Sequence, residues 1–300
     1  VRKKLKITAE DICPLNDALI YASLTGYGEV GPDADRTAYD SMAWWARSGL
    51  MDFVRPSSQS SIAWSTPGMG DHPTGMALYG AIVTALYRRE KTGKGGEVST
   101  SLMANGAWAN GVFIQAALMD VEFPARLEPL PRHPFYDFYK TKDDREFALG
   151  MINAENEWPK LTKVLDRMEL FEDPRFLPDK LLENTVELKE ELSKEFLKRT
   201  LDEVNNLLRS SGVTYGVLGR TTDHRSDPQF LETETLVNLE HEEFDGLLTV
   251  NSPITLKGEE KKDAFRAPKI GEHTKEVLGL LGVNEEELLR LNKEGAIYWE

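Results

Sequence analysis

The chain has 300 residues, 40% hydrophobic and 29% charged, with a net charge of −14. That composition is typical of a folded protein, and the acidic balance argues against nucleic acid as a partner, because phosphate binding needs clustered Lys and Arg. The single cysteine, Cys13, excludes a disulfide framework, leaves zinc and iron–sulfur sites unsupported, and fits a cytoplasmic location. No apolar run is long enough to span a bilayer, so we expect no membrane insertion.

The first strand is predicted to run into a glycine-rich turn. Residues 1–19 have a helical pattern with Thr8 as a cap, and residues 18–24 form a short apolar run. The sequence Thr-Gly-Tyr-Gly of residues 25–28 follows directly. A buried strand that ends in such a turn is the usual site-forming junction of a parallel α/β sheet. The glycine spacing does not match the dinucleotide fingerprint, so we do not expect nicotinamide binding.

The candidate reactive group is Asp71, which lies among three glycines and before a nearly uncharged run of residues 76–87. We interpret it as an acid at the N-terminus of a buried helix, where free N–H groups and the helix dipole favour a carboxylate. The alternative is that Asp71 only caps the helix, since Asp is a preferred capping residue. The helix is predicted to end at residues 92–96, where glycines follow a basic last turn.

Two further helices and a strand are predicted around it. Residues 39–51 read as a helix that carries Trp44 and Trp45, for which core packing is the alternative interpretation, and residues 52–66 read as a loop. A strand over residues 97–102 and a helix of small residues over 104–118 follow.

The composition changes after about residue 123, where four prolines predict a linker: Pro124, Pro129, Pro131 and Pro134. Two strands around a polar turn are predicted for residues 135–149. Amphipathic helices are predicted near 155–169, 178–194 and 200–210, followed by a β-rich piece over 213–256 and a helical end over 274–296.

Several segments in this order resemble one family, the class III coenzyme A transferases, which include carnitine-pathway transferases, formyl-CoA transferases and α-methylacyl-CoA racemases. The segments are LIYASLTGYG (19–28), GP to YD (31–40), GDHPTG (70–75), ALYRREKTGKG (85–95) and APKIGEHT (267–274). Each is weak alone, but together they run nearly from end to end. Family members usually carry about a hundred more residues before this point, so the resemblance implies that an N-terminal part is missing, an expectation that the lack of an initiator Met supports.

The resemblance implies an α/β fold with a Rossmann-like large domain built from both chain ends, a smaller α+β domain, and an interlocked dimer. The corresponding divisions are a CoA-binding domain over 1–125, a small domain with its linker over 126–225, and a return to the large domain over 226–300. The expected partners are acyl-CoA and a carboxylic acid, in a homodimer or a heteromer.

The resemblance also implies a nucleophile, which is Asp71 here. It would attack an acyl-CoA to form an aspartyl anhydride and then an aspartyl-CoA thioester, from which CoA passes to the acceptor acid. Coenzyme A enters as a substrate, and no metal is needed. A carboxylate must be desolvated and aimed to act in this way, and backbone N–H groups must stabilise the oxyanions.

The remaining site residues follow from the same matches. Thr25, Gly26, Tyr27 and Gly28 correspond to the family stretch that contacts CoA. Segment 44–51 is similar to a subgroup that acts on 2-hydroxy acids, aromatic acids and bile acids. Trp44, Trp45, Met69 and Gly70, with Trp64 nearby, are candidates for an acyl pocket.

Two alternatives stay open. A racemase needs two acid–base groups, and this family's racemases use a histidine where the chain has Tyr39, a poor base at neutral pH; transfer is therefore preferred. The chain could also be a non-catalytic or partner-dependent subunit, for which CoA affinity would be the discriminating measurement.

Overall fold

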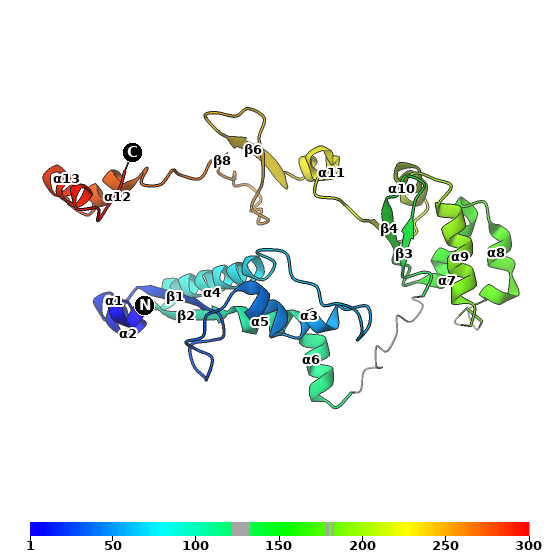
Figure 1. The fold of residues 1–300 in the computed structure, drawn as a ribbon, viewed down its shortest axis with the longest axis horizontal. Helices are drawn as coiled ribbons and strands as arrows, with labels where there is room; N and C mark the ends of the chain where they lie inside the picture. The colour runs from blue at the N-terminus through cyan, green and yellow to red at the C-terminus, as the bar shows by residue number, and fades with distance from the viewer. Residues whose placement is uncertain (122–132, 178–179, 182, 300) are drawn as a thin grey trace. The chain divides into compact units, whose positions relative to one another are not determined.

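The computed structural model describes residues 1–121, 133–177, 180–181 and 183–299. It separates into two units, Val1–Pro131 and Arg132–Glu300, each of which is described by itself (Figure 1). Three of the four linker prolines, Pro124, Pro129 and Pro131, lie outside the described residues. Helices and strands alternate through the chain, so the mixed α/β class is confirmed. The three-part domain division and the dimer stay predictions.

The first unit is built around a parallel strand pair and one long helix. β1 (Ile20–Thr25) pairs with β2 (Gly96–Ser101) from Ile20 opposite Gly96 to Thr25 opposite Ser101. Parallel neighbours need a crossover connection, and α4 (Asp71–Thr92) lies in that connection, packed alongside both strands (Figure 1). Gly93, at φ +72°, ends the helix in the left-handed conformation, as predicted.

The expectation of a buried helix at residues 71–92 is wrong for this chain by itself. Only Thr74 and Ala85 of α4 are buried. The strand pair covers one side of the helix, and large apolar side chains stand exposed elsewhere on it: Met76, Tyr79, Val83 and Tyr87. A charge-free sequence predicts burial on all sides, but no described part of the first unit packs over these side chains.

The other predicted helices of the first unit are shorter than expected. The N-terminal stretch forms α1 (Arg2–Leu5), α2 (Ala9–Ile12) and the 3₁₀ turn η1 (Cys13–Leu15); Thr8 caps α2 in a reciprocal capping box with Asp11. The helix predicted over 39–51 is a π-helix, η2 (Ser41–Ala46), separated from α3 (Leu50–Phe53) by Gly49 at φ +84°. The helix predicted over 104–118 is divided at Asn110 into α5 (Leu102–Ala109) and α6 (Gly111–Leu118).

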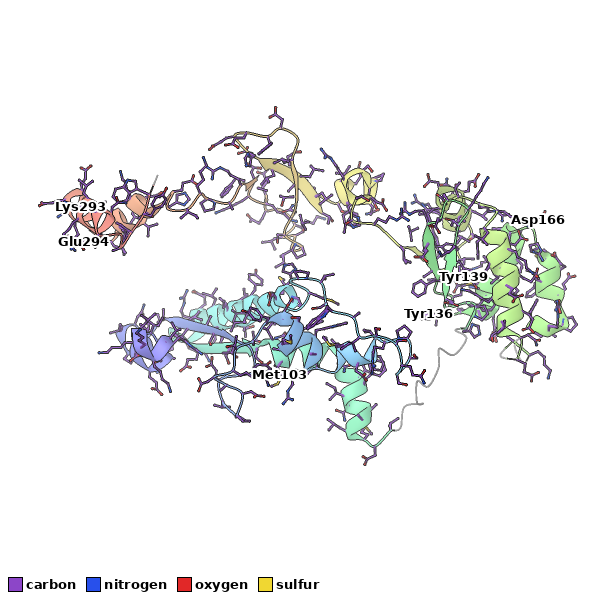
Figure 2. All side chains as sticks on the ribbon, viewed as in Figure 1. Met103, Tyr136, Tyr139, Asp166, Lys293 and Glu294 are labelled. Atoms are coloured by element: carbon purple, nitrogen blue, oxygen red, sulfur yellow. The ribbon has the colours of Figure 1, made fainter. Side chains whose placement is uncertain are left out.

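The second unit contains the larger hydrophobic core. β3 (Phe138–Lys140), β4 (Glu146–Leu149) and β5 (Tyr215–Val217) form an antiparallel sheet in that order. Four α-helices accompany it: α7 (Ala154–Val164), α8 (Met168–Glu172), α9 (Thr185–Phe196) and α10 (Leu201–Arg209), with η3 (Pro174–Phe176) between α8 and α9. Tyr139, labelled in Figure 2, Phe147 and Phe196 meet in the core and are 2% exposed or less.

The rest of the second unit consists of short elements. η4 (His224–Ser226) and α11 (Pro228–Glu232) precede β6 (Leu236–Glu240), which pairs with β7 (Leu248–Val250) and β8 (Ala264–Phe265). α12 (Thr274–Leu280) and α13 (Glu285–Lys293) follow, as the helical pattern predicts. Across the described ranges, no helix combines the length and the apolar character that a membrane crossing requires.

Candidate active site

The direction of α4 places Asp71 at the edge where the parallel strands end. The helix ends at Thr92, four residues before Gly96, which pairs with the first residue of β1. Arg89, near the end of the helix, donates to the carbonyl of Ala18 at 3.3 Å. α4 therefore runs opposite to the strands. Its 22 residues span about 33 Å, against about 20 Å for a six-residue strand. Its N-terminus thus extends beyond the carboxyl ends of β1 and β2.

Asp71 is the first residue of the helix, and its side chain is exposed. Gly70, and not Asp71, occupies the N-cap position, so the interpretation of Asp71 as the capping residue is wrong. The following turn is held by the backbone, with Thr74 Oγ1 donating to the Gly70 carbonyl at 2.7 Å. The Asp71 carboxylate therefore does not serve as the helix cap, and it lies where the helix dipole favours negative charge.

Gly70 fixes the position of Asp71 through two neighbours. A Cβ built on Gly70 would lie 2.6 Å from both Cβ and Cγ of Trp44, so only glycine allows this approach. The Gly70 N–H donates to Asp40 Oδ2 at 3.4 Å, while Asp40 Oδ1 accepts from the Ser41 N–H at 2.5 Å. The start of α4 is thereby tied to the start of η2.

The turn of residues 25–28 lies at the same edge. The Gly28 N–H donates to Thr25 Oγ1 at 3.0 Å, and Gly28 has φ +116°, a conformation that favours glycine. Gly26 is in close contact with Ala38, and its carbonyl accepts from the N–H of Met103 at 3.0 Å, at the start of α5 (Figure 2). The turn is therefore held against both the loop before Asp40 and the chain that leaves β2.

Glu29, next to this turn, is held by Arg2 and Ser23. Both guanidinium nitrogens of Arg2 donate to the Glu29 carboxylate, one of them at 2.8 Å, and Ser23 Oγ contacts it as well. The hydrogen bonds from Arg2, and then that from Ser23, hold the pKa of Glu29 below its usual value. Glu29 thus stays ionised and anchors the far side of the turn to the N-terminal helix.

The predicted pocket residues fall into two groups. Trp44 and Trp45 are 7% and 6% exposed and stack with their ring centroids 6.0 Å apart, in a small core with Tyr27, Ala43 and Leu102. Met69 and Trp64 are exposed, at 41% and 66%. The structure therefore brings Trp44, Gly70 and Asp71 together, whereas Trp45 donates its indole N–H to the carbonyl of Ala63 at 2.9 Å.

Tyr39 and His72, the residue after Asp71, occupy different surroundings. Tyr39 is 71% exposed, and its carbonyl accepts from the N–H groups of Met42 and Ala43. The ring of His72 lies against Gly68, where a Cβ would be 3.1 Å from its Cε1 and Nε2. In the described part of the chain, no group of three or more His, Cys, Asp or Glu side chains could hold a metal ion.

Sequence reasoning missed the contact between Asp40 and Gly70. The two residues are 30 positions apart, and nothing local in the sequence pairs them. The resulting arrangement contains one exposed carboxylate at a helix start, a second carboxylate that accepts a hydrogen bond from the residue before Asp71, and a glycine turn at the same sheet edge. It can support nucleophilic attack by a carboxylate on an activated acyl group.

Comparisons with known proteins show what the chain is similar to. The model of a family described as CoA-transferase family III matches residues 1–274. The chain is 31% identical over 287 residues to (R)-2-hydroxy-4-methylpentanoate CoA-transferase of Clostridioides difficile, covering 95% of this chain and 71% of that protein. It is 28% identical over 283 residues to cinnamoyl-CoA:phenyllactate CoA-transferase of Clostridium sporogenes, covering 92% and 68%. The crystal structure of a CAIB/BAIF family protein from Brucella suis superposes with a TM-score of 0.79 at 25% identity, covering 93% of this chain and 72% of that one.

Proposed function

The chain belongs to CoA-transferase family III and is a CoA-transferase by class, and we propose that Asp71 is its nucleophile in moving CoA from an acyl-CoA to a carboxylic acid. The observation that carries the proposal is the position of Asp71. It is the first residue of α4, exposed at the carboxyl edge of the parallel strands, and tied through Gly70 to Trp44 and Asp40.

The reaction balances without redox chemistry or net proton transfer. The Asp71 carboxylate attacks the thioester carbonyl of the donor, the carbon–sulfur bond breaks, and CoA leaves as a thiolate. The thiolate attacks the aspartyl carbonyl of the resulting anhydride, which releases the donor acid and leaves an aspartyl-CoA thioester. The acceptor carboxylate displaces CoA again, and the thiolate then takes the acceptor acyl group and restores Asp71.

The first turn of α4 and the glycine turn supply what this carboxylate chemistry needs. Backbone N–H groups at a helix start lie where a developing oxyanion is stabilised. We assign the turn of Thr25, Gly26, Tyr27 and Gly28 to the CoA chain, because its positive-φ Gly28 lets a ligand approach the backbone. The tight contact of Gly70 with Trp44 keeps Asp71 aimed.

We further propose a 2-hydroxy acid, branched or aromatic, as the acceptor. Two relatives support this class, since one is named for (R)-2-hydroxy-4-methylpentanoate and the other for phenyllactate. Trp44 packs against Gly70 at the start of the Asp71 helix, and Met69 and Trp64, which precede that helix, are exposed to receive such a group. The Rossmann-like large domain and the interlocked dimer are part of the same proposal. The exposed apolar side chains of α4 support an additional packing partner.

The test uses the full-length protein with an acyl-CoA donor and a panel of acids, with the acyl-CoA products separated by chromatography. We expect transfer to 2-hydroxy acids, and an Asp71→Asn variant should lose it by about 10⁴-fold or more. Asp120→Asn is the matched control: Asp120 is exposed and has φ +55°, which Asn tolerates. Transfer that survives in Asp71→Asn, or activity with small dicarboxylates alone, would refute the respective part of the proposal. Deuterium exchange at the acyl α-carbon without any acceptor would indicate a racemase instead.

A further inference from the structure

One pair of arginines in the first unit shares a single carboxylate. Arg36 Nη1 lies 3.6 Å from Asp33 Oδ1, and Arg47 Nη2 lies 3.8 Å from Asp33 Oδ2. Both separations exceed the usual length of a hydrogen bond. Within the described chain neither guanidinium donates a hydrogen bond, so two cations face one anion and their N–H donors remain available to a ligand.

The guanidinium of Arg36 packs on an aromatic ring, and the backbone of Arg47 is held at the end of η2. Arg36 lies over the ring of Tyr27 with its Cζ 5.4 Å from the ring centroid, and Tyr27 is 7% exposed in the small core at the glycine turn. Arg47 follows η2, and its backbone N–H donates to the Met42 carbonyl at 3.0 Å. The side chains themselves are 61% and 58% exposed. The pair is thus partly preorganised and open to solvent.

The other described arginines of the first unit are engaged elsewhere. Their partners lie within hydrogen-bond distance: Glu29 for Arg2, Ser58 for Arg55, Gly95 for Arg88 and Ala18 for Arg89. The last two lie where β1 and β2 begin, away from Asp71. Arg36 and Arg47 are therefore the arginines with spare donors on the segments that pack at the carboxyl edge, next to the glycine turn.

We propose that Arg36 and Arg47 form an anion-binding pair that receives a phosphate of the CoA used at the Asp71 site. This inference rests on the proposed function. Arginine binds phosphate groups with paired N–H donors. CoA is strongly anionic and this chain carries a net charge of −14, so a local cationic position is needed to hold it. Arg36 covers Tyr27 in the turn assigned to CoA, which places the pair beside that ligand.

The experiment measures CoA binding to the full-length protein by isothermal titration calorimetry, with KM values for monocarboxylic and dicarboxylic acids measured alongside. Arg47→Gln is the main variant, because it leaves the packing of Arg36 on Tyr27 intact; Arg36→Gln is the second. Arg47→Lys keeps the charge. Arg290→Gln, in the ion pairs of α13 with Glu287 and Glu294, is the matched control.

We expect Arg47→Gln to weaken CoA binding by about tenfold, with a smaller salt dependence of binding and an unchanged unfolding midpoint. Arg47→Lys should recover part of the loss. Weaker binding of CoA but not of dephospho-CoA identifies the 3′-phosphate. Weaker binding of both identifies the diphosphate. A raised KM for dicarboxylic acids with unchanged CoA affinity would assign the pair to an acid substrate and overturn the inference.

The inference is also overturned if Arg36→Gln and Arg47→Gln both keep their CoA affinity within twofold of that of Arg290→Gln. This failure is separable from failure of the proposed function, because covalent labelling of Asp71 by acyl-CoA is scored on the same variants. Labelling that persists without any change in affinity removes the arginine pair and leaves the nucleophile in place. A loss of CoA affinity in a protein whose Asp71 is never labelled leaves the arginine pair and removes the nucleophile.

Discussion

Replacing Gly70 with alanine tests whether the start of α4 is positioned by close packing. The added Cβ would lie 2.6 Å from two atoms of Trp44 and 3.0 Å from a third. Trp44 cannot easily move away, because it is 7% exposed, stacks on Trp45, and has its carbonyl against Gly106. The helix start, with Asp71 as its first residue, must shift instead.

Two opposing contributions set the change in the free energy of unfolding of Gly70→Ala. Overpacking of this kind costs about 1–3 kcal/mol, whereas the reduced chain entropy of Ala in the unfolded state returns about 0.4–1 kcal/mol. We expect Gly70→Ala to lower the free energy of unfolding by about 1–2 kcal/mol. A displacement of Asp71 by about 1 Å should reduce kcat by about 10²-fold.

Gly80→Ala is the matched control within the same helix. A Cβ on Gly80 meets nothing within 4 Å, so this substitution should raise the free energy of unfolding by about 0.5–1 kcal/mol. Urea unfolding followed by tryptophan fluorescence, together with steady-state kinetics, measures both variants. The reasoning fails if the two substitutions change stability in the same direction, or if Gly70→Ala keeps the kcat of the parent protein.

Three further predictions concern other contacts. Asp40→Ala removes the acceptor for the Gly70 N–H and should lower kcat by about tenfold with little change in KM. Asp40→Asn keeps an acceptor oxygen and should retain most activity. Equal losses of kcat in the two variants would show that the charge of Asp40 matters instead. Hydrogen bonds from Arg266, and then from the backbone of Lys269, lower the pKa of Glu272 to about 2 from an ordinary value of 4.5. The stabilisation from this pair is therefore present above about pH 4.5 and is lost as the pH falls towards 2. Arg266→Gln should raise the pKa of Glu272 towards 4.5 in an NMR titration, and a pKa that stays near 2 would contradict the assignment. Leu188 is fully buried, so Leu188→Ala should lower the free energy of unfolding by about 2–5 kcal/mol. A decrease of less than about 1 kcal/mol in urea unfolding would show that the second unit repacks around the smaller side chain.

The elements that were predicted correctly have strong local signals. The strand before the glycine turn, the C-terminus of α4 at Gly93, the Thr8 cap and the strands around residue 142 follow from residue type and spacing. Two of the predicted helices that are interrupted in the structure are divided at Gly49 and Asn110. Asn110 Nδ2 donates to the Ser48 carbonyl at 2.9 Å, a contact over 62 residues that helical periodicity does not reveal.

The residues of the candidate site are proposals from the sequence, and their contacts come from the structure. Asp71 stands out from the sequence because it interrupts glycines before an uncharged run. Its support by Trp44 and Asp40 depends on the packing of η2 against the start of α4, which joins segments about 30 residues apart. The prediction that α4 is buried failed because an apolar sequence does not say which surface covers it. The pairing of Arg36 and Arg47 with Asp33 could not be predicted from the sequence either, because a loop and a π-helix separate the two arginines along the chain.

The central claim is that Asp71 becomes covalently bonded to the acyl group and then to CoA. The direct measurement incubates the full-length protein with acyl-CoA, adds hydroxylamine or borohydride to capture the activated carboxyl, and locates the modified residue by peptide mass spectrometry. We predict modification at Asp71 that requires acyl-CoA and is absent in Asp71→Ala, which also fails to transfer CoA. An Asp71→Ala protein that still transfers CoA, or capture at a different carboxyl group, would contradict the account.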